Sequence, residues 1–354
     1  MRRRLGLGLF GTNASNGICF SDPPYVTETT WAGTVAVARL ADDIGFDLLV
    51  PLARWKGFGG RINMNSTVFE TFTCAAGLAV QTSRITVVAT CHAPAIHPVA
   101  AAKQAVTVDH ISGGRFALNL VLGWFEPELA MFGITPAEHG ERYRYGEEWL
   151  TIVSRLWKEA EPFDFAGRFF DGSGLEALPK PIRPGGPVII NAGSSPTGVQ
   201  FSAKYADVNF MPIFNIDSAG RHALEIKQLA SQHGRSIQVM SYSTMICADT
   251  EVEAKARYDE IIAHADWEGA ENFMRFIGLN SESFGDQLHQ TRERFVTCTG
   301  GYPLVGTPEQ VAEQLVAISD SGIDGMLFGV LDHQRELPYF AEHVLPLLKK
   351  AGIR

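Results

Sequence analysis

Short β-like runs alternate repeatedly with longer helical segments, and this feature most limits what the chain can fold into. Apolar runs rich in β-branched and aromatic residues predict strands at Leu5–Gly11, Phe46–Leu52, Ile85–Thr90, Phe116–Gly123, Val188–Gly193, Val208–Ile213, Val239–Ala248 and Gly325–Leu331. Helical spacing of apolar residues predicts helices at Thr30–Ile44, Val68–Gln81, Pro98–His110, Arg144–Lys158, Pro196–Tyr205, Ala219–His233, Glu251–His264 and Thr307–Ser321. Strands that alternate with helices pair in parallel through right-handed crossovers. Eight such units favour an α/β fold, the (β/α)8 TIM barrel, and an open doubly wound sheet is the alternative.

The chain is interpreted as a single barrel domain over residues 1–354, because no linker or low-complexity tract interrupts the strand–helix units. Two gaps between units, near residues 124–142 and 267–304, are too long for simple loops. Long excursions from a barrel are typically lids or interface elements. We therefore expect the second insertion to close over an active site.

The charge and cysteine pattern limits the partners of the chain. A formal net charge of -9 argues against nucleic acid or an anionic membrane as the main partner, since both require a basic face. The five cysteines contain no C-x-x-C pair, which is typical of reduced thiols in a cytosol. The histidines show no metal-binding spacing, and no run approaches the roughly 18 apolar residues of a membrane span. The sequence predicts a soluble, cytoplasmic protein without a metal site.

A glycine motif near the start of the chain matches a dinucleotide-binding fingerprint by letter. Gly6-Leu-Gly8-Leu-Phe-Gly11 lies inside the first predicted strand, whereas the fingerprint requires its glycines in the turn after a strand and before a helix. The residues that follow cannot start a helix. We interpret these glycines as permitting close packing inside a narrow barrel.

The junction after the Val188 strand has the pattern of a phosphate-binding turn. Gly193 turns the chain, Ser194 follows, Ser195 occupies an N-cap position, and Pro196 occupies the first helical position. Amide groups at such a helix start attract a phosphate, and the Ser195 hydroxyl can add a hydrogen bond. The alternative is that Ser195 merely caps the helix.

Polar residues at two strand positions suggest contact with a ligand. Asn119 lies within an apolar strand, where an amide is costly unless it has a partner, and Thr90 ends the strand before it. A ligand with donors and acceptors, such as a flavin ring edge, would meet that need. A purely structural hydrogen bond is the alternative for Asn119, and threonine is also simply a good strand former.

Basic residues and one histidine supply further candidates. Arg142 and Arg144 can pair with a phosphate or can lie on a solvated helix start, and Arg54 opens a glycine-rich basic turn of equal ambiguity. His333 follows the last strand, where acid–base chemistry is well placed, although lone histidines are more often structural.

Several motifs resemble those of one known family. Ile111-Ser-Gly-Gly-Arg-Phe116 and Asn119-Leu-Val-Leu-Gly-Trp124 resemble the signature of bacterial-luciferase-like flavin monooxygenases, and Leu304-Val-Gly-Thr-Pro-Glu309 is similar to the segment before their last barrel helix. Within the family, Arg54…Gly57-Phe-Gly-Gly60 resembles the pyrimidine ring-opening monooxygenases. Gly123-Trp-Phe125 resembles the dimethyl sulfone and alkanesulfonate monooxygenases. The resemblance spans nearly the whole chain.

The resemblance implies roles for individual residues. It implies FMN contacts at Ala53, Arg54, Asn119, Glu128, Arg142, Tyr143 and Ser195. It implies that Thr90 and Asn119 are catalytic and line a pocket beside flavin N5 where oxygen reacts, with reaction at C4a as the open alternative. It implies a non-prolyl cis peptide at Ala89–Thr90. Departures from the pyrimidine enzymes around His92 and at Phe125 indicate side chains that face the substrate, and Trp124 and His333 are further candidates for substrate contact.

The resemblance also implies an activity. The expected enzyme takes FMNH₂ from a separate NAD(P)H:FMN reductase, uses O₂, and oxidises a small polar substrate such as a pyrimidine-like amide, a sulfone or a sulfonate. A homodimer or homotetramer is expected. The alternatives are a deazaflavin-dependent oxidoreductase on the same barrel, a non-catalytic flavin-binding barrel, and an unrelated barrel hydrolase. The natural substrate, the reductase and the oligomeric state stay open.

Overall fold

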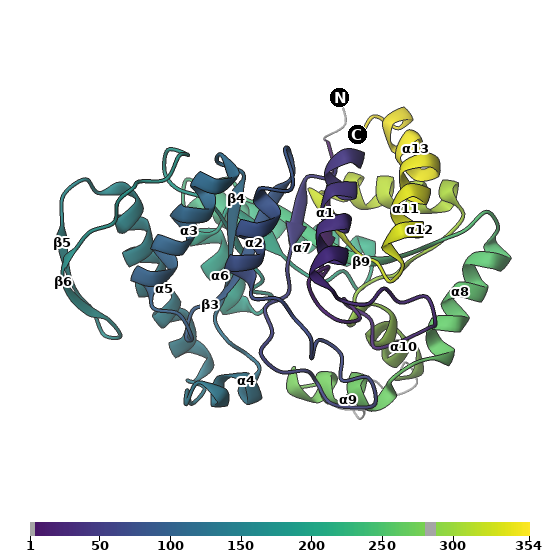
Figure 1. Cartoon of the computed structure of the whole chain (residues 1–354), viewed down its shortest axis with the longest axis horizontal. Coiled ribbons are helices and arrows are strands. Elements are labelled where there is room, and N and C mark those ends of the chain that lie inside the picture. Colours follow the sequence, from purple (N-terminus) through teal and green to yellow (C-terminus); the bar gives the residue numbers. More distant parts are fainter. Residues whose placement is uncertain (1–3, 280–287) are drawn as a thin grey trace.

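Eight parallel strands close into a barrel in the computed structural model, which describes residues 4–279 and 288–354 (Figure 1). The barrel strands are β1 (Gly6–Phe10), β2 (Leu48–Val50), β3 (Thr86–His92), β4 (Phe116–Val121), β7 (Val188–Asn191), β8 (Val208–Phe210), β9 (Gln238–Cys247) and β11 (Gly325–Gly329). Strands β1, β2, β3, β4, β7 and β8 pair in that order, and β9 joins β8 to β11, which returns to β1. Closure confirms the predicted (β/α)8 barrel. It excludes the open sheet, which would leave two unpaired edges.

All of the predicted helices are present. They are α1 (Trp31–Ile44), α2 (Thr71–Ala79), α3 (Pro98–Ser112), α5 (His139–Lys158), α6 (Pro196–Tyr205), α7 (Ile216–Gln232), α8 (Glu251–Ala263) and α11 (Pro308–Asp320). Helix α5 begins at His139 and not at the predicted Arg144. Its first turn contains Gly140 and polar residues, so it shows no apolar spacing that the sequence pattern could reveal.

Other elements were not predicted from the sequence pattern. They are α4 (Glu126–Met131), the antiparallel pair β5 (Phe163–Ala166) and β6 (Asp171–Leu175), α9 (Trp267–Phe276), α10 (Leu288–Cys298), β10 (Leu304–Gly306), α12 (His333–Tyr339), a π-helical turn (Phe340–Val344) and α13 (Leu345–Lys350). The first predicted insertion holds α4 and the start of α5. The second holds α9 and α10, and its residues 280–287 lie outside the described residues. The lid expected there stays a prediction.

Alternation along the strands decides which side chains point into the barrel. Val88 of β3 and Ala117 of β4 belong to an apolar cluster to which all the barrel strands except β1 contribute buried residues, as expected for the barrel interior. Side chains two residues apart share one face of a strand. Thr90 and Asn119 therefore point into the barrel one step closer to its carboxyl end, where enzymes of this fold place their chemistry.

Gly8, in the glycine motif of β1, lies where strands β11 and β2 approach closely. A Cβ atom at Gly8 would overlap the Leu327 side chain and would lie 3.0 Å from the Leu48 carbonyl oxygen. The absence of a side chain is therefore a packing requirement of the barrel. This supports the interpretation of the motif as a structural feature and not as a dinucleotide site.

Among the residues described, no helix combines the length and the apolar character needed to cross a bilayer.

Glu336 of α12 carries a half-buried carboxyl group that makes stability depend on pH. Its oxygens accept hydrogen bonds from the backbone N–H groups of Leu331 and Asp332 at 3.2 and 3.3 Å. Burial raises the pKa of Glu336 from 4.5 to about 8. Because the folded pKa lies above the unfolded value, the stabilising contribution is complete below pH 4.5 and is lost as pH rises toward 8.

We expect Glu336→Gln to raise the melting temperature, with a gain that grows between about pH 5.5 and about pH 8.5, because the amide cannot ionise. Thermal unfolding of both proteins across this range measures the gain. A gain that does not change with pH would contradict the assignment.

Candidate active site at the carboxyl end of the barrel

Thr90 and Asn119 are register partners on the neighbouring strands β3 and β4, and their side chains meet. The Asn119 Nδ2 donates to Thr90 Oγ1 at 3.1 Å, and Thr90 Oγ1 donates to the Pro51 carbonyl oxygen at 2.7 Å. Both side chains are buried. Asn119 Oδ1 is also buried and finds no partner in the described part of the chain. The structural alternative explains the amide nitrogen but leaves this oxygen as an acceptor available to a ligand.

The peptide bond before Thr90 does not have the expected cis geometry. The cis peptide bond found within residues 4–279 and 288–354 is Leu178–Pro179, so the expectation for Ala89–Thr90 was wrong. Strand β3 continues past Thr90 and keeps its parallel pairing with β4 as far as His92. A regular ladder of this kind uses extended trans peptides throughout.

A buried ion pair lies beside the polar strand pair. Arg54 Nη1 lies 2.9 Å from Glu128 Oε2, and both side chains are almost completely buried. Glu128 Oε1 also accepts from the Trp55 backbone N–H at 2.8 Å. The Arg54 guanidinium lies over the Trp124 ring, 4.9 Å from its centroid. Glu128 therefore neutralises Arg54 and holds the turn that follows β2.

His92 lies two residues after Thr90 and is neutral. Its Nε2 is 3.8 Å from Glu128 Oε2. Burial, together with the positive charge of Arg54, lowers the pKa of His92 to about 3. His92 can therefore act as a neutral donor or acceptor near physiological pH, but it carries no positive charge.

The turn between β7 and α6 has the predicted geometry of a helix start. Ser195 is the N-cap residue, and its Oγ accepts from the Gly198 N–H at 3.1 Å. The same oxygen lies 3.2 Å from His139 Nε2. The capping role is therefore real, and the hydroxyl also faces a second polar side chain that could contact a bound anion.

A cavity of about 430 Å³ opens in front of this turn. Its lining includes the predicted residues Trp124, Arg142, Tyr143, Gly193, Ser194 and Ser195, together with His139 and Phe276. Arg142 Nη1 donates to the Gly123 carbonyl oxygen at 2.6 Å, while its buried Nε has no partner in the described part of the chain. A helix start that faces an arginine whose Nε–H is free to donate a hydrogen bond is a favourable site for a phosphate.

A smaller cavity of about 60 Å³ lies beside Thr90. Its lining includes Ala53, Arg54, Thr90 and His92. The structure therefore divides most of the predicted residues between two cavities. Asn119 lines neither of them, although its partner Thr90 lines the second, and Glu128 links Arg54 to His92 beside it. His139 was not predicted, because the sequence pattern started α5 after it.

Two residues predicted to face the substrate lie elsewhere. Phe125 is 2% exposed and packs in an aromatic cluster, with its ring 5.1 Å from Phe58 and 4.7 Å from Phe276. His333 lines a separate cavity of about 20 Å³ near the start of α1. Burial lowers the pKa of His333 to about 4. In this structure neither residue joins the cavities that contain Thr90 or Arg142.

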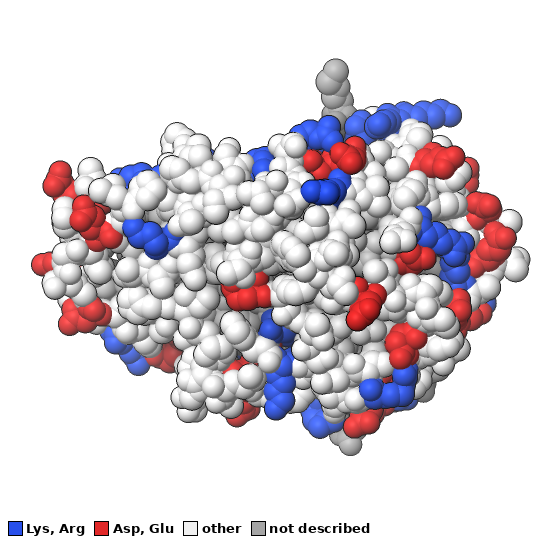
Figure 2. Space-filling model, viewed as in Figure 1, with Lys and Arg blue, Asp and Glu red and all other residues white. Residues whose placement is uncertain are grey.

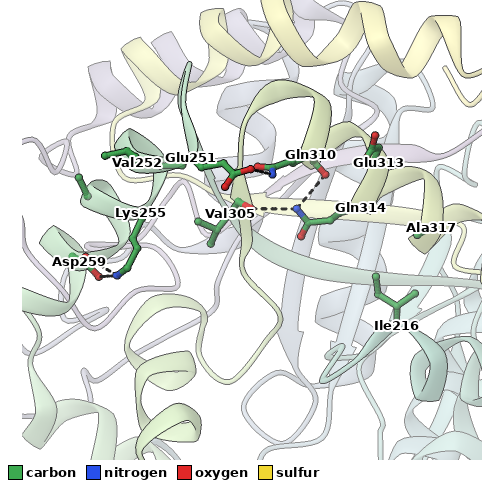
Figure 3. A pocket seen from close by; sticks show the side chains of 13 residues that line it. Ile216, Glu251, Val252, Lys255, Asp259, Val305, Gln310, Glu313, Gln314 and Ala317 are labelled. Carbon is green, nitrogen blue, oxygen red and sulfur yellow. Dashed lines mark hydrogen bonds and ion pairs between the residues drawn. The ribbon is translucent and has the colours of Figure 1, made fainter.

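A cavity of about 980 Å³ lies outside the barrel between α8 and α11 (Figure 3). No predicted site residue lines it. Its polar groups bond to one another: Lys255 pairs with Asp259 at 2.7 Å, Gln310 donates to Glu251, and Gln314 donates to the Val305 carbonyl oxygen at 3.2 Å. We place no chemistry in this open groove.

A barrel whose carboxyl end combines an anion-binding helix start with a buried polar pair defines a cofactor-dependent barrel enzyme. The model of the luciferase-like monooxygenases matches residues 17–325, and the chain belongs to that family. It is accordingly an oxidoreductase of the luciferase-like monooxygenase type.

Individual relatives agree with this assignment. The chain is 31% identical over 344 residues to the FMNH(2)-dependent dimethylsulfone monooxygenase of Pseudomonas putida, covering 96% of this chain and 93% of that one. It is 32% identical over 353 residues to the pyrimidine monooxygenase of Acinetobacter baylyi, covering 97% and 94%. The solved structure of DmoA from Hyphomicrobium sulfonivorans superposes with a TM-score of 0.84 at 21% identity, covering 99% and 89%, which shows the shared fold.

Proposed function

We propose that this protein is an FMNH₂- and O₂-dependent monooxygenase that acts on a small polar organic substrate. The observation that carries the proposal is the buried Thr90–Asn119 pair, which leaves Asn119 Oδ1 without a partner at the carboxyl end of the barrel. A flavin ring edge has donors that suit such an acceptor. The FMNH₂ dependence named for the dimethylsulfone relative supports the choice of cofactor.

The residues present fit FMN. The helix start at Ser195, with Arg142 and Tyr143, would hold the phosphate. Ala53 and Arg54, which line the small cavity, would hold the ring together with Asn119, the hydrogen-bond partner of Thr90. The reduced cofactor supplies two electrons to dioxygen, so that one oxygen atom enters the substrate and the other leaves as water. Thr90 fixes Asn119, and the neutral His92 can donate or accept a hydrogen bond beside the substrate.

The charges around Thr90 favour an uncharged substrate. The lining of the small cavity contains one cation, Arg54, which Glu128 neutralises, the carboxylate of Glu70, which caps α2, and the neutral His92. A sulfonate would find no unpaired positive charge among these described residues, whereas a sulfone or a cyclic amide needs none. The names of the dimethylsulfone and pyrimidine relatives point to the same class.

We also propose that the reduced flavin comes from a separate NAD(P)H:FMN reductase. The glycine motif of β1 serves barrel packing and offers no nicotinamide site.

Assembly as a homodimer or homotetramer is proposed as well. On the face drawn in Figure 2, few charged groups lie over α1 to α3, which suits self-association, and light scattering would measure it.

The test supplies photoreduced FMN and ¹⁸O₂ to the purified protein with uracil, dimethyl sulfone or methanesulfonate. We expect one ¹⁸O atom in the product of an uncharged substrate and no product without oxygen. Substrate loss under anaerobic conditions would indicate a hydrolase. Flavin binding without oxygen-coupled turnover would indicate a non-catalytic barrel, and turnover with a deazaflavin alone would indicate the other oxidoreductase class.

Arg142 gives a direct test of the phosphate site. We expect Arg142→Ala to weaken FMN binding by about 10- to 100-fold, because a hydrogen bond to a charged group contributes about 1.5–3 kcal/mol. Riboflavin, which lacks the phosphate, should bind equally well to both proteins. Arg144→Ala is the matched control, because Arg144 is exposed and pairs with Glu141 at 2.8 Å. Equal FMN affinity in the Arg142 variant, measured by fluorescence titration, would remove this arginine from the site.

A further inference from the structure

We propose that Ser202 and Asn209 are positioning residues that set the geometry of the phosphate-binding turn at residues 193–195, and this inference rests on the proposed function. Both side chains are completely buried, Ser202 on α6 and Asn209 on β8. Neither lines the cavity in front of the turn. They can therefore influence a bound phosphate through the turn and not by contact.

A chain of hydrogen bonds connects these side chains to the turn. Asn209 Nδ2 donates to Ser202 Oγ at 2.9 Å and to the Gly193 carbonyl oxygen at 3.0 Å. Ser202 Oγ donates to Asn191 Oδ1 at 2.7 Å. Asn191 Oδ1 also accepts from the Gly193 N–H at 3.0 Å, and Asn191 Nδ2 donates to the Leu120 carbonyl oxygen at 2.8 Å. Both peptide groups of Gly193 are thus fixed by the same network.

The turn needs this support because it is held against α6 at very short range. A Cβ atom at Gly193 would lie 2.7 Å from Gly198 Cα, so only glycine fits at this position. Gly198 in turn lies against Tyr143, since a Cβ atom there would be 2.5 Å from the tyrosine hydroxyl. A shift of Gly193 would therefore change the position of the Ser195 cap relative to Arg142 and Tyr143.

The polar side chains of Ser202 and Asn209 lower the stability of the fold relative to apolar residues that would pack equally well. Buried amides and hydroxyls destabilise a fold unless they are hydrogen-bonded, and apolar residues of similar volume would fill the same space. Asn209 Oδ1 has no partner in the described part of the chain, so part of that cost is not offset. What the polar groups add is a fixed direction for the Gly193 peptide groups.

The experiment compares FMN and riboflavin, which differ by the phosphate, as ligands of the full-length protein. We expect Ser202→Ala and Asn209→Ala to weaken FMN binding by about 5- to 20-fold, because bonds that hold the turn are lost. Riboflavin affinity should stay within about twofold. The ³¹P resonance of bound FMN should shift in both variants. Ser241→Ala is the matched control, because Ser241 is equally buried and its hydroxyl has no partner among the residues described.

Each outcome decides the inference. An FMN-to-riboflavin affinity ratio that stays at the wild-type value would overturn it, whether both affinities are unchanged or both fall together, since the latter shows a merely structural role. If Asn209→Ala does not fold, the milder Ser202→Ala gives the same ratio test. If the wild-type protein binds neither flavin, the proposed function fails and this inference fails with it. If the wild-type protein binds FMN tightly and the variants bind it with the same affinity, the inference fails while the proposed function stands.

Discussion

Replacing Asn119 with alanine is expected to lower FMNH₂-dependent turnover by about 100-fold or more while the barrel stays folded. Removal of one hydrogen-bonding group aimed at the reacting atoms costs about 10²–10³ in kcat for comparable sites. Asn119 is such a candidate, because its Oδ1 has no protein partner among the described residues while its Nδ2 is held by Thr90 at 3.1 Å. The melting temperature should fall little, since the substitution removes an amide whose oxygen makes no hydrogen bond within the described residues.

Thr90 provides the matched pair of variants for this prediction. Thr90→Ser keeps the hydroxyl that donates to Pro51 and accepts from Asn119, so it should retain most of the activity. Thr90→Val removes that hydroxyl at nearly constant volume and should lower turnover in the same direction as Asn119→Ala. Single-turnover oxidation with bound FMNH₂ separates turnover from flavin binding. Unchanged turnover in Asn119→Ala would show that the residue is structural.

The barrel could be predicted from the sequence because its signals are local. Each strand is a short apolar run, and each of the eight predicted helices shows apolar spacing or a cap such as Ser195 before Pro196. The elements that were missed lack those signals. The β5–β6 pair is largely exposed and alternates weakly, and the first turn of α5 at His139 is polar. Tertiary contacts decide such segments, and a sequence window does not contain them.

The site could be predicted only in part, for a similar reason. Thr90, Asn119 and the Ser195 turn were predictable because barrel strands end at a common face. The Arg54–Glu128 pair joins residues far apart in the chain, so its charge neutralisation became visible only in the structure. The network of Ser202 and Asn209 was invisible for the same reason, since neither residue stands at a motif. His333 lines a separate cavity, because following a strand does not decide which cavity a side chain reaches, and its contact with the substrate stays a prediction.

Glu128→Ala is expected to destabilise the protein by about 3–5 kcal/mol, since removal of one partner of a buried ion pair leaves the other charge unpaired. Arg54 would lose its carboxylate at 2.9 Å while its side chain stays almost completely buried, and the Trp55 N–H would lose its acceptor. Urea unfolding measures the change. Glu126→Ala is the control, because Glu126 lies on the same helix α4 but is exposed, and it should change the unfolding free energy little.

A double variant separates stability from function at this pair. Arg54→Met combined with Glu128→Leu removes both charges and fills the space, and buried pairs replaced in this way often regain full stability. If the pair serves the site, the double variant should fold as well as the wild type yet bind FMN weakly, because Arg54 lines the cavity beside Thr90. Restored stability together with normal flavin affinity would show that the pair only supports the turn after β2. The comparison thus assigns the buried Arg54–Glu128 pair either to the fold or to the cofactor site.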